Sequence, residues 1–375
     1  HVSAENTIGF LMCDSRIDYA SLIQTLMAAL PFPVIGGTTL TMPLSSVGNE
    51  LSAVLTIFEK EGLTWSIAVS DPFDKPRIPE HMKALYNSCI SGLTGTPRLL
   101  IPFIPLIPGM TADVDAVISE IFSLAGNVPV FGGITTDDLD TTKAAVFAHG
   151  KAYSDRMALL ALGGNISPVF GIGSRITAMS EYAPAVTESE GNIVRQVDGM
   201  PFCDYMKTIG IDPEERINGL DALVQYGPLP VQLKYKLADD DGVPEMRCIS
   251  YTNTQDGSAV FSSTLPVGTR LNVGILTKDD VIESARECLR SVTEQMRERE
   301  QAGQSYSMLL LVPCVARYFA MIGGQNLESL FLSQEVPHGL AMSSYYGFCE
   351  IAPSLGKNGE IHNRSYNASV VMCAL

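Results

Sequence analysis

A strand–helix–strand unit that closes on a glycine turn recurs along this chain, and this repeat limits the possible folds more than any other feature. In the first copy, the apolar run Ile8–Met12 predicts a buried strand, and Ala20–Leu30 has the apolar spacing of a helix. Prolines then stop the helix, and Val34–Thr39 predicts a strand that runs into a Gly-Gly turn. The unit therefore predicts two strands joined by one helix.

The unit returns twice. In the second copy, Leu99–Phe103 is the first strand, Asp113–Leu124 is the helix, and Pro129–Thr136 nearly repeats the first glycine turn. In the third copy, Met308–Pro313 is the strand and Leu327–Leu332 the helix, but no Gly-Gly pair follows. The other strands of these copies are predicted to be Tyr346–Ile351 and three hairpins: Leu51–Phe58 with Leu63–Val69, Ala144–His149 with Met157–Leu162, and Glu360–His362 with Ser369–Ala374. Between the second and third copies, Asp279–Arg299 predicts the longest helix, with its charges on the exposed face and distal end. Further strands are predicted there at Gly171–Ile176, Ala185–Val197, Cys248–Thr252, Gly257–Ser262 and Leu271–Ile275.

Strands outnumber helices in this pattern. So few helices cannot cover both faces of every sheet, as a doubly wound fold requires. We therefore predict an α+β fold in which mixed sheets stack with helices outside, built from repeated strand–helix–strand–hairpin units. A chain of 375 residues is too long for one ordinary domain, which predicts two or three.

Composition excludes several classes of function. The formal net charge of −16 argues against nucleic acid, because a phosphate backbone needs clustered Lys and Arg. No apolar run approaches the roughly 20 residues that cross a bilayer, so we expect no membrane partner. The eight cysteines form no Cys-x-x-Cys pair and no His lies at zinc-ligand spacing, so we expect no metal and no other cofactor. Dilute cysteines without a signal peptide predict a cytoplasmic location, and the initial His1 predicts a trimmed or tagged start.

Three residues of the third copy could carry chemistry. Cys314 is predicted at a strand end near Arg317, where a cation favours the thiolate, although a packed strand-end cysteine is the simpler interpretation. A guanidinium near a buried strand end needs a carboxylate or a ligand. Glu350 could be that carboxylate in a structural ion pair. Alternatively, Arg317 binds the carboxylate of an amino acid and Glu350 binds its amine.

Other candidates surround these three. His362 and Asn363 at a strand start could donate to a ligand or finish a turn. The second glycine turn, with Gly132, Gly133 and Thr135, is structural by default, but a glycine pair can also turn backbone N–H groups toward an anion. If Cys314 were a nucleophile and His362 its base, the protein would be a thiol-dependent hydrolase or transferase. No known catalytic motif supports this alternative. A module that only contacts other proteins is a further alternative.

At this point the sequence resembles the FIST domain family of sensory modules, which have an N-terminal and a C-terminal half. Nearly the whole chain carries the resemblance, through the order and spacing of its elements more than through any single one. The similar segments are Pro33–Thr39, Pro129–Thr136, Met157–Leu162, Ala185–Pro201, Asp256-Gly257, Leu265–Gly268, Cys-x-x-Arg at Pro313–Arg317, Tyr346–Ile351 and His362-Asn363. Phe348, Cys349 and Val315-Ala316 depart from the family pattern, which predicts a pocket of different shape.

The resemblance implies two parts: a FIST N-terminal-like domain at residues 1–200 and a FIST C-terminal-like domain at residues 201–375. It also implies an intracellular sensor that binds a small molecule, an amino acid or small carboxylate, and signals through a separate output protein. We expect binding and no catalytic residue. The expected site is a cleft where Arg317 and Glu350 meet the glycine turns, with Cys314, His362, Asn363, Gly132, Gly133 and Thr135 as its other residues.

Overall fold

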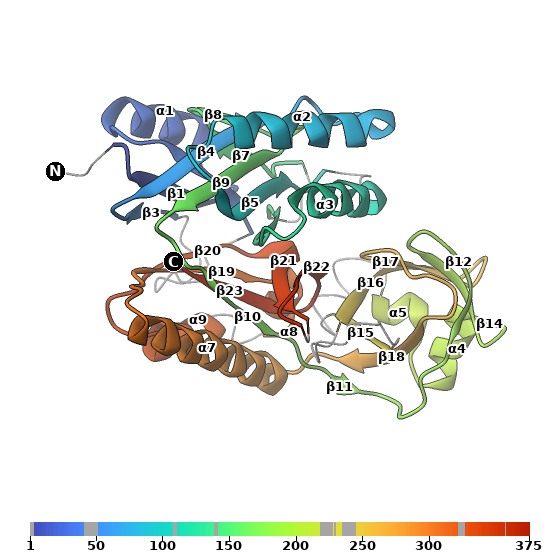
Figure 1. Cartoon of the computed structure of the whole chain (residues 1–375). Coiled ribbons are helices and arrows are strands. Elements are labelled where there is room, and N and C mark those ends of the chain that lie inside the picture. Colours follow the sequence, from blue (N-terminus) through green and yellow to red (C-terminus); the bar gives the residue numbers. More distant parts are fainter. Residues whose placement is uncertain are drawn as a thin grey trace.

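The computed structural model describes residues 4–40, 52–107, 111–138, 142–217, 228, 230–234, 245–321, 327–356 and 358–375. Figure 1 shows a body of stacked sheets with helices on its outer sides, and a smaller lobe beside it. The helices are α1 (Tyr19–Ala29), η1 (Lys75–Arg77), α2 (Ile78–Ser91), α3 (Thr111–Ala125), α4 (Phe202–Thr208), α5 (Pro213–Ile217), α7 (Lys278–Gln301), α8 (Val315–Ala320) and α9 (Leu327–Glu335).

Three mixed sheets form the body. The first has the order β3 (Ala53–Glu59), β1 (Thr7–Asp14), β2 (Val34–Thr39), β7 (Val146–Ala148), β8 (Lys151–Tyr153). The second has the order β22 (Ile361–Tyr366), β21 (Gly347–Leu355), β6 (Gly132–Thr135), β5 (Pro97–Pro105), β9 (Ala158–Gly164), β4 (Leu63–Val69). The third has the order β10 (Val169–Gly173), β23 (Val370–Ala374), β19 (Met308–Pro313), β20 (Ala341–Ser344). Mixed sheets with helices outside them confirm the predicted fold class.

Each sheet of the body contains one parallel pair of strands: β1 with β2, β5 with β6, and β19 with β20. Parallel neighbours need a crossover connection. Helix α1 supplies it in the first sheet, α3 in the second, and α8 with α9 in the third. Whether the three units derive from one repeated sequence stays a prediction.

All three predicted hairpins are wrong. Strand β3 pairs with β1, whereas β4 pairs with β9 in another sheet. Likewise β22 pairs with β21, whereas β23 pairs with β10 and β19. The short turns between these strands therefore carry the chain from one sheet to the next. In the second unit the short strands β7 and β8 pair with each other, and β9 pairs with β4 and β5.

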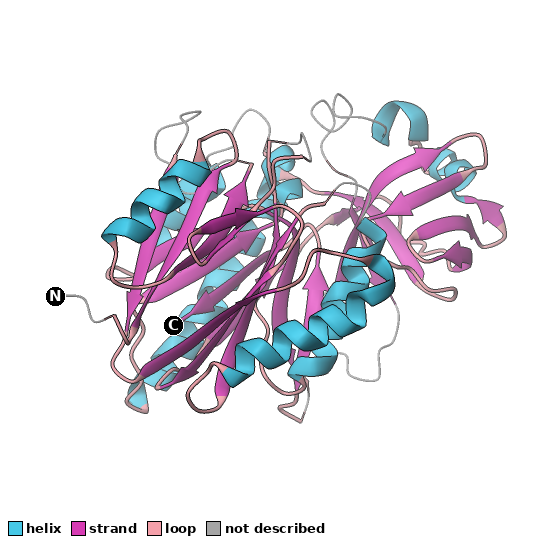
Figure 2. Cartoon of the chain, turned by 90° about the horizontal axis from the view of Figure 1, so that it is seen from above, coloured by secondary structure: helices cyan, strands magenta, loops and turns pink. Residues whose placement is uncertain are grey.

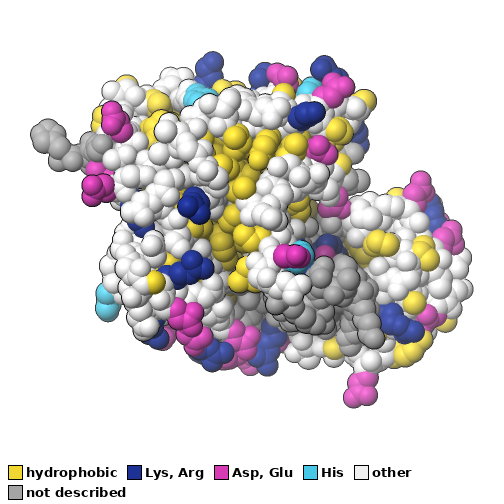
Figure 3. All heavy atoms as spheres, viewed as in Figure 1, with side chains coloured by type: hydrophobic (Ala, Val, Ile, Leu, Met, Phe, Trp, Pro, Cys, Tyr) yellow, Lys and Arg dark blue, Asp and Glu magenta, His cyan; other side chains and the backbone are white. Residues whose placement is uncertain are grey.

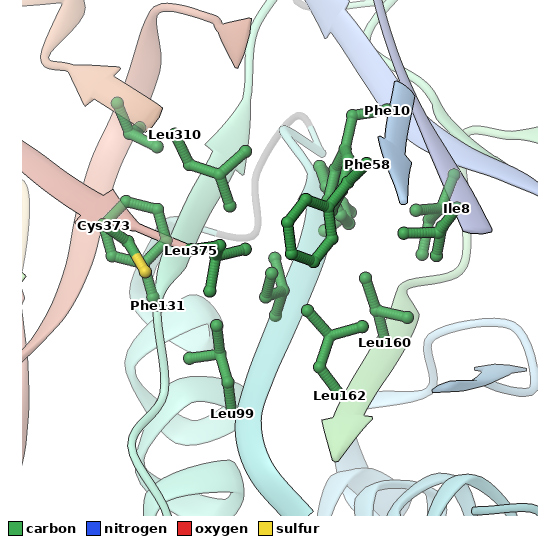
Figure 4. Close-up of a cluster of buried hydrophobic side chains, with 14 of the residues drawn as sticks. Ile8, Phe10, Phe58, Leu99, Phe131, Leu160, Leu162, Leu310, Cys373 and Leu375 are labelled. Carbon is green, nitrogen blue, oxygen red and sulfur yellow. The ribbon is translucent and has the colours of Figure 1, made fainter. Parts of the chain in front are cut away.

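The main hydrophobic core lies between the three sheets. Inward-facing side chains alternate along each strand, as in Ile8, Phe10 and Met12 of β1, which are almost fully buried. Figure 4 shows side chains from all three sheets pointing toward one another, with Phe10 and Phe58 near Leu160. The sheets are thus held together by packing of their inner faces.

The lobe contains a further sheet and its own core. In order, its strands are β11 (Thr177–Ala178), β18 (Arg270–Ile275), β15 (Pro230–Lys234), β16 (Glu245–Asn253), β17 (Ser258–Phe261), β13 (Ile193–Val197) and β12 (Val186–Glu190), with β14 (Met200–Pro201) beside β13. The chain enters the lobe after β10 and returns to the body with α7. A capping box at Thr277 and Asp280 starts this long helix. In Figures 1 and 2, α7 runs along the outside of the body.

Strands from both sides of the expected boundary at residue 200 share sheets. Strand β10 pairs with β23, β6 pairs with β21, and β13 pairs with β17. The division into 1–200 and 201–375 stays a prediction about sequence domains. No described helix is both long enough and apolar enough to span a membrane.

The ends of the strands that follow the three crossovers meet inside the body. The Thr136 hydroxyl donates to the carbonyl of Tyr346 at 2.8 Å and accepts the N–H of Leu40 at 3.1 Å. The N–H of Tyr346 donates to the Thr39 hydroxyl at 2.9 Å, and the Thr38 hydroxyl donates to the carbonyl of Thr136 at 2.8 Å. Threonines of the two glycine turns therefore fasten the turns to each other and to the third unit.

Candidate functional site

Five of the eight predicted site residues lie together where β21 meets the second glycine turn. On β21, Glu350 is opposite Gly133, and Gly347 is opposite Thr135. Cys314 forms an isolated bridge with Gly347. The five residues are Glu350, Cys314, Gly132, Gly133 and Thr135. The structure thus brings the third unit and the second glycine turn together.

The glycine turn at this junction is closely packed. A Cβ on Gly133 would lie 2.5 Å from the carbonyl oxygen of Cys349, and one on Gly132 would lie 2.7 Å from that of Pro102. Distances this short leave no room for any side chain. Thr135 is completely buried and donates its hydroxyl to backbone carbonyls. These residues are therefore required for the approach of neighbouring strands.

Glu350 is a buried carboxyl that forms no ion pair within the described residues. Its side chain is 0% exposed, and Oε2 accepts hydrogen bonds from the Ser369 hydroxyl at 2.8 Å and the Ser369 N–H at 3.3 Å. Oε1 has no hydrogen-bond partner in the described part of the chain. Burial raises the pKa of Glu350 from 4.5 to about 8, against the opposing effect of the bonds from Ser369 and of the Cys314 thiol. The carboxyl is therefore mainly protonated at neutral pH.

The proposed ion pair of Arg317 with Glu350 is wrong. Arg317 is also 0% exposed, and its Nε and Nη2 donate to Oε1 of Glu328 at 2.9 and 2.6 Å. Its Nη1 donates to the Ser284 hydroxyl at 3.0 Å, and Nη2 donates to the carbonyl of Val281 at 2.7 Å. Arg317 thus joins α8 to α7 and α9, and its guanidinium donors are occupied by groups of the protein itself.

Cys314 and His362 do not form a nucleophile–base pair. Cys314 bridges to Gly347 at one end of β21, whereas His362 is opposite Ser354 near the other end. Seven residues separate these two positions of the strand, which is roughly 20 Å at about 3.3 Å per residue. Direct proton transfer between the two side chains is therefore excluded in this fold.

We predict that the folded chain has no fast-reacting thiol. Seven cysteines are buried and Cys248 is half-buried. Burial raises the pKa of Cys89 to about 11 and of Cys248 to about 12, and it raises the pKa of Cys314 well above its ordinary value, where Glu350 adds to the effect. With Ellman's reagent, all eight thiols should react in denaturant and none rapidly in buffer. A fast thiol that is lost in Cys314→Ser would contradict this and support the enzyme alternative.

His362 and Asn363 lie on β22, away from the junction. The Asn363 amide accepts the N–H of Val130 at 2.8 Å and donates to the carbonyl of Val128 at 2.9 Å. His362 packs against Gly356, and its Nε2 is buried without a hydrogen-bond partner in the described residues. Asn363 therefore fixes the segment that leads into the second glycine turn.

That segment forms one wall of a large pocket among the described residues. The pocket has a volume of about 680 Å³, within the usual size range of small-molecule sites. It lies beside the edge of β10 and the adjoining side of α7, and the ends of β5, β21 and β22 complete its walls. We call it the β10–α7 pocket. Its lining residues are Thr96, Pro97, Arg98, Asn127, Val128, Pro129, Ile166, Ser167, Pro168, Phe170, Gly171, Ile172, Ser291, Gln295, Arg299, Pro353, Ser354, Leu355 and Ile361.

The pocket combines an apolar surface with two cations. Phe170 and Ile172 of β10 are half-buried apolar residues of its lining beside several prolines, and none of the lining residues is acidic. Arg299 donates to the Ser167 hydroxyl at 3.0 Å. Within the described ranges, no acidic side chain forms an ion pair with Arg98 or Arg299. Figure 3 shows hydrophobic side chains gathered in a band that runs from top to bottom near the middle of this view.

Reasoning from the sequence missed Arg98, Arg299 and the rest of this pocket. Charges at the end of a long helix are expected on its exposed face, and most charged side chains of α7 do lie there. One signal was present: Ser291, Gln295 and Arg299 recur every four residues and so share one face of the helix. The other walls come from distant segments, and only the fold brings them together.

A smaller cavity of about 10 Å³ lies in the core next to Tyr345 and Gly132. That is about the space of one water molecule, too small for an amino acid. Among the described residues, no group of three or more His, Cys, Asp or Glu side chains is arranged to hold a metal ion. Of these two spaces, the β10–α7 pocket is the one that can hold a small ligand.

Comparison with known proteins gives two kinds of similarity. A family model described as the FIST N domain matches residues 7–200, and one described as the FIST C domain matches residues 205–353. Among solved structures, a cyanuric acid hydrolase described as an evolutionary innovation by structural concatenation is similar with a TM-score of 0.36 and 8% identity, over 100% of this chain and 92% of that one. A cyanuric acid hydrolase from A. caulinodans has a TM-score of 0.35 and 9% identity, over 98% of this chain and 89% of that one. No curated protein matches the chain.

Proposed function

This chain belongs to the FIST family, and from that premise we propose that it is a sensor that binds an amino acid or another small carboxylate in the β10–α7 pocket. FIST domains are known as sensory domains that bind small ligands. The observation that carries the proposal is a pocket of about 680 Å³ whose two arginines lack acidic partners among the described residues. In a chain with a net charge of −16, such cations suit an anionic ligand.

This proposal places the ligand away from Arg317 and Glu350, where the sequence predicted it. Both side chains are completely buried, and Arg317 already bonds to Glu328, Ser284 and Val281. A ligand there would have to displace a buried ion pair and enter a packed core. Asn363 keeps a role, because it holds Val128, which lines the pocket. Signal output is proposed to pass to a separate protein.

A thermal-shift screen over amino acids and small carboxylates tests this function. A ligand that binds only the folded chain at 100 times its Kd stabilises it by about 2.7 kcal/mol, which raises Tm measurably. Ser291 is exposed on α7 and lines the pocket, so Ser291→Trp should fill the pocket and abolish the shift. Ser88→Trp, at an exposed helical serine of α2 outside the pocket, is the matched control and should keep it. Hits that survive Ser291→Trp would contradict the proposed site.

A further inference from the structure

We propose that the ligand of the β10–α7 pocket is a carboxylate with an apolar tail and no ammonium group, of the medium-chain alkanoate type. This inference rests on the proposed function, because it names the ligand class of the same pocket. In this arrangement the ionised head lies against Arg299 and Arg98, and the tail lies along β10 on Phe170 and Ile172. Free amino acids are then the poorer of the two ligand classes.

The pocket has a charged end at Arg299, and contacts between α7 and β10 give the direction away from it. Arg299 bonds to Ser167, which precedes β10, and the Gln295 amide donates to the carbonyl of Phe170 at 2.7 Å. Helix α7 and strand β10 therefore run antiparallel along the pocket. Ser291 lies two turns before Arg299, which at 1.5 Å per residue is about 12 Å along the helix. A ligand of that length reaches from the guanidinium of Arg299 past Phe170 toward the far end.

Arg98 belongs to the same charged end. Pro97, its neighbour on β5, is opposite Gly163 near the end of β9. Ser167 follows shortly after β9, in the connection to β10. Both arginines thus flank the connection from β9 to β10. Two guanidinium groups without acidic partners in the described structure offer charge-assisted hydrogen bonds to one carboxylate.

An ammonium group has no comparable partner in the pocket. None of the lining residues is acidic, and the two charged ones repel a cation. Bringing an ammonium group out of water without an anion is unfavourable, and the site binds an analogue more weakly when it carries an unpaired polar group. The apolar tail gains about 25 cal/mol for each Å² of surface that it removes from water. Charge and burial together favour an alkanoate over the amino acid of equal length.

Isothermal titration with four eight-carbon probes tests the ligand class. Octanoate, 2-aminooctanoate, octan-1-ol and octylamine differ in the head group and share an apolar tail. We expect octanoate to bind at least tenfold more tightly than 2-aminooctanoate, and octylamine not to bind. Arg299→Gln and Arg98→Gln should each weaken octanoate at least tenfold and leave octan-1-ol unchanged. Arg297→Gln, an exposed position of α7 outside the pocket, is the matched control and should bind octanoate like the wild type.

The outcomes separate this inference from the proposed function. If 2-aminooctanoate or octylamine binds as tightly as octanoate and Ser291→Trp abolishes the binding, the pocket is a ligand site but the inferred class is wrong. Equal binding of octanoate by the wild type, Arg98→Gln and Arg299→Gln also overturns the class. If Ser291→Trp leaves binding of every probe unchanged, the probes do not bind in this pocket and the inferred ligand class is wrong. The proposed function then falls as well if the thermal-shift hits also survive that variant.

Discussion

Replacing Arg317 with methionine should lower the free energy of unfolding by about 3–5 kcal/mol, the range found when one partner of a buried ion pair is removed. The substitution leaves the Glu328 carboxyl in the interior without its cation, where the exposed fraction of its side chain is 3%. It also removes the hydrogen bonds to Ser284 and Val281 that join α8 to α7. Urea unfolding followed by circular dichroism at neutral pH measures the change.

A double variant separates the lost charge pair from lost packing. Arg317→Met with Glu328→Leu places two apolar side chains where the pair was and leaves no buried charge. Apolar replacements of similar volume are often neutral or stabilising, so the double variant should recover most of the stability lost in Arg317→Met. A cost below about 1 kcal/mol for Arg317→Met would contradict the described pair, as would a double variant that is less stable than the single one.

Glu350 should make the folded chain less stable as pH rises from about 4.5 to about 8. Its pKa is raised from 4.5 to about 8 by burial, so the folded chain keeps a proton that the unfolded chain releases. Stability is therefore greatest below pH 4.5 for this group and is lost as pH rises through about 8, by up to roughly 1.4 kcal/mol per pH unit. Glu350→Gln retains the shape and cannot ionise, so it should remove this decline.

Unfolding free energies measured between pH 5 and pH 8.5 for the wild type and Glu350→Gln compare the two slopes. We expect the variant to gain stability relative to the wild type toward the alkaline end. Glu360→Gln, at an exposed glutamate in the turn before β22, is the matched control and should keep the wild-type slope. Coinciding slopes for the wild type and Glu350→Gln would show that the Glu350 carboxyl is not held protonated by burial.

The sequence contains most of the information about strands and helices and little about which strands pair. Apolar runs and helical spacing located β1, β5, β19 and α7, because burial of one face imposes those patterns. The hairpin predictions were wrong because a short turn has the same sequence pattern whether the two strands that it joins pair with each other or enter different sheets. Strand β20 was missed because it is short and ends in two serines, which carry no apolar signal.

The sequence did not show which side chains pair with each other at the predicted site. Arg317 was expected to need a carboxylate, which is correct, but the partner is Glu328 and not Glu350. Nothing in the sequence distinguishes a helical glutamate that turns inward from an exposed one. The β10–α7 pocket could not be predicted either, because its walls come from five distant parts of the chain. Arg98 has no local pattern, and the four-residue spacing of Ser291, Gln295 and Arg299 indicates only a shared helix face.

The most direct test of the central claim, that the β10–α7 pocket is the ligand site, is a crystal structure of the chain with the strongest hit of the thermal-shift screen. We predict ligand density between Phe170 and Arg299, with the hydrogen bonds between Arg317 and Glu328 unchanged. Density in the interior against Glu350 and Arg317, with the β10–α7 pocket occupied only by water, would contradict the account.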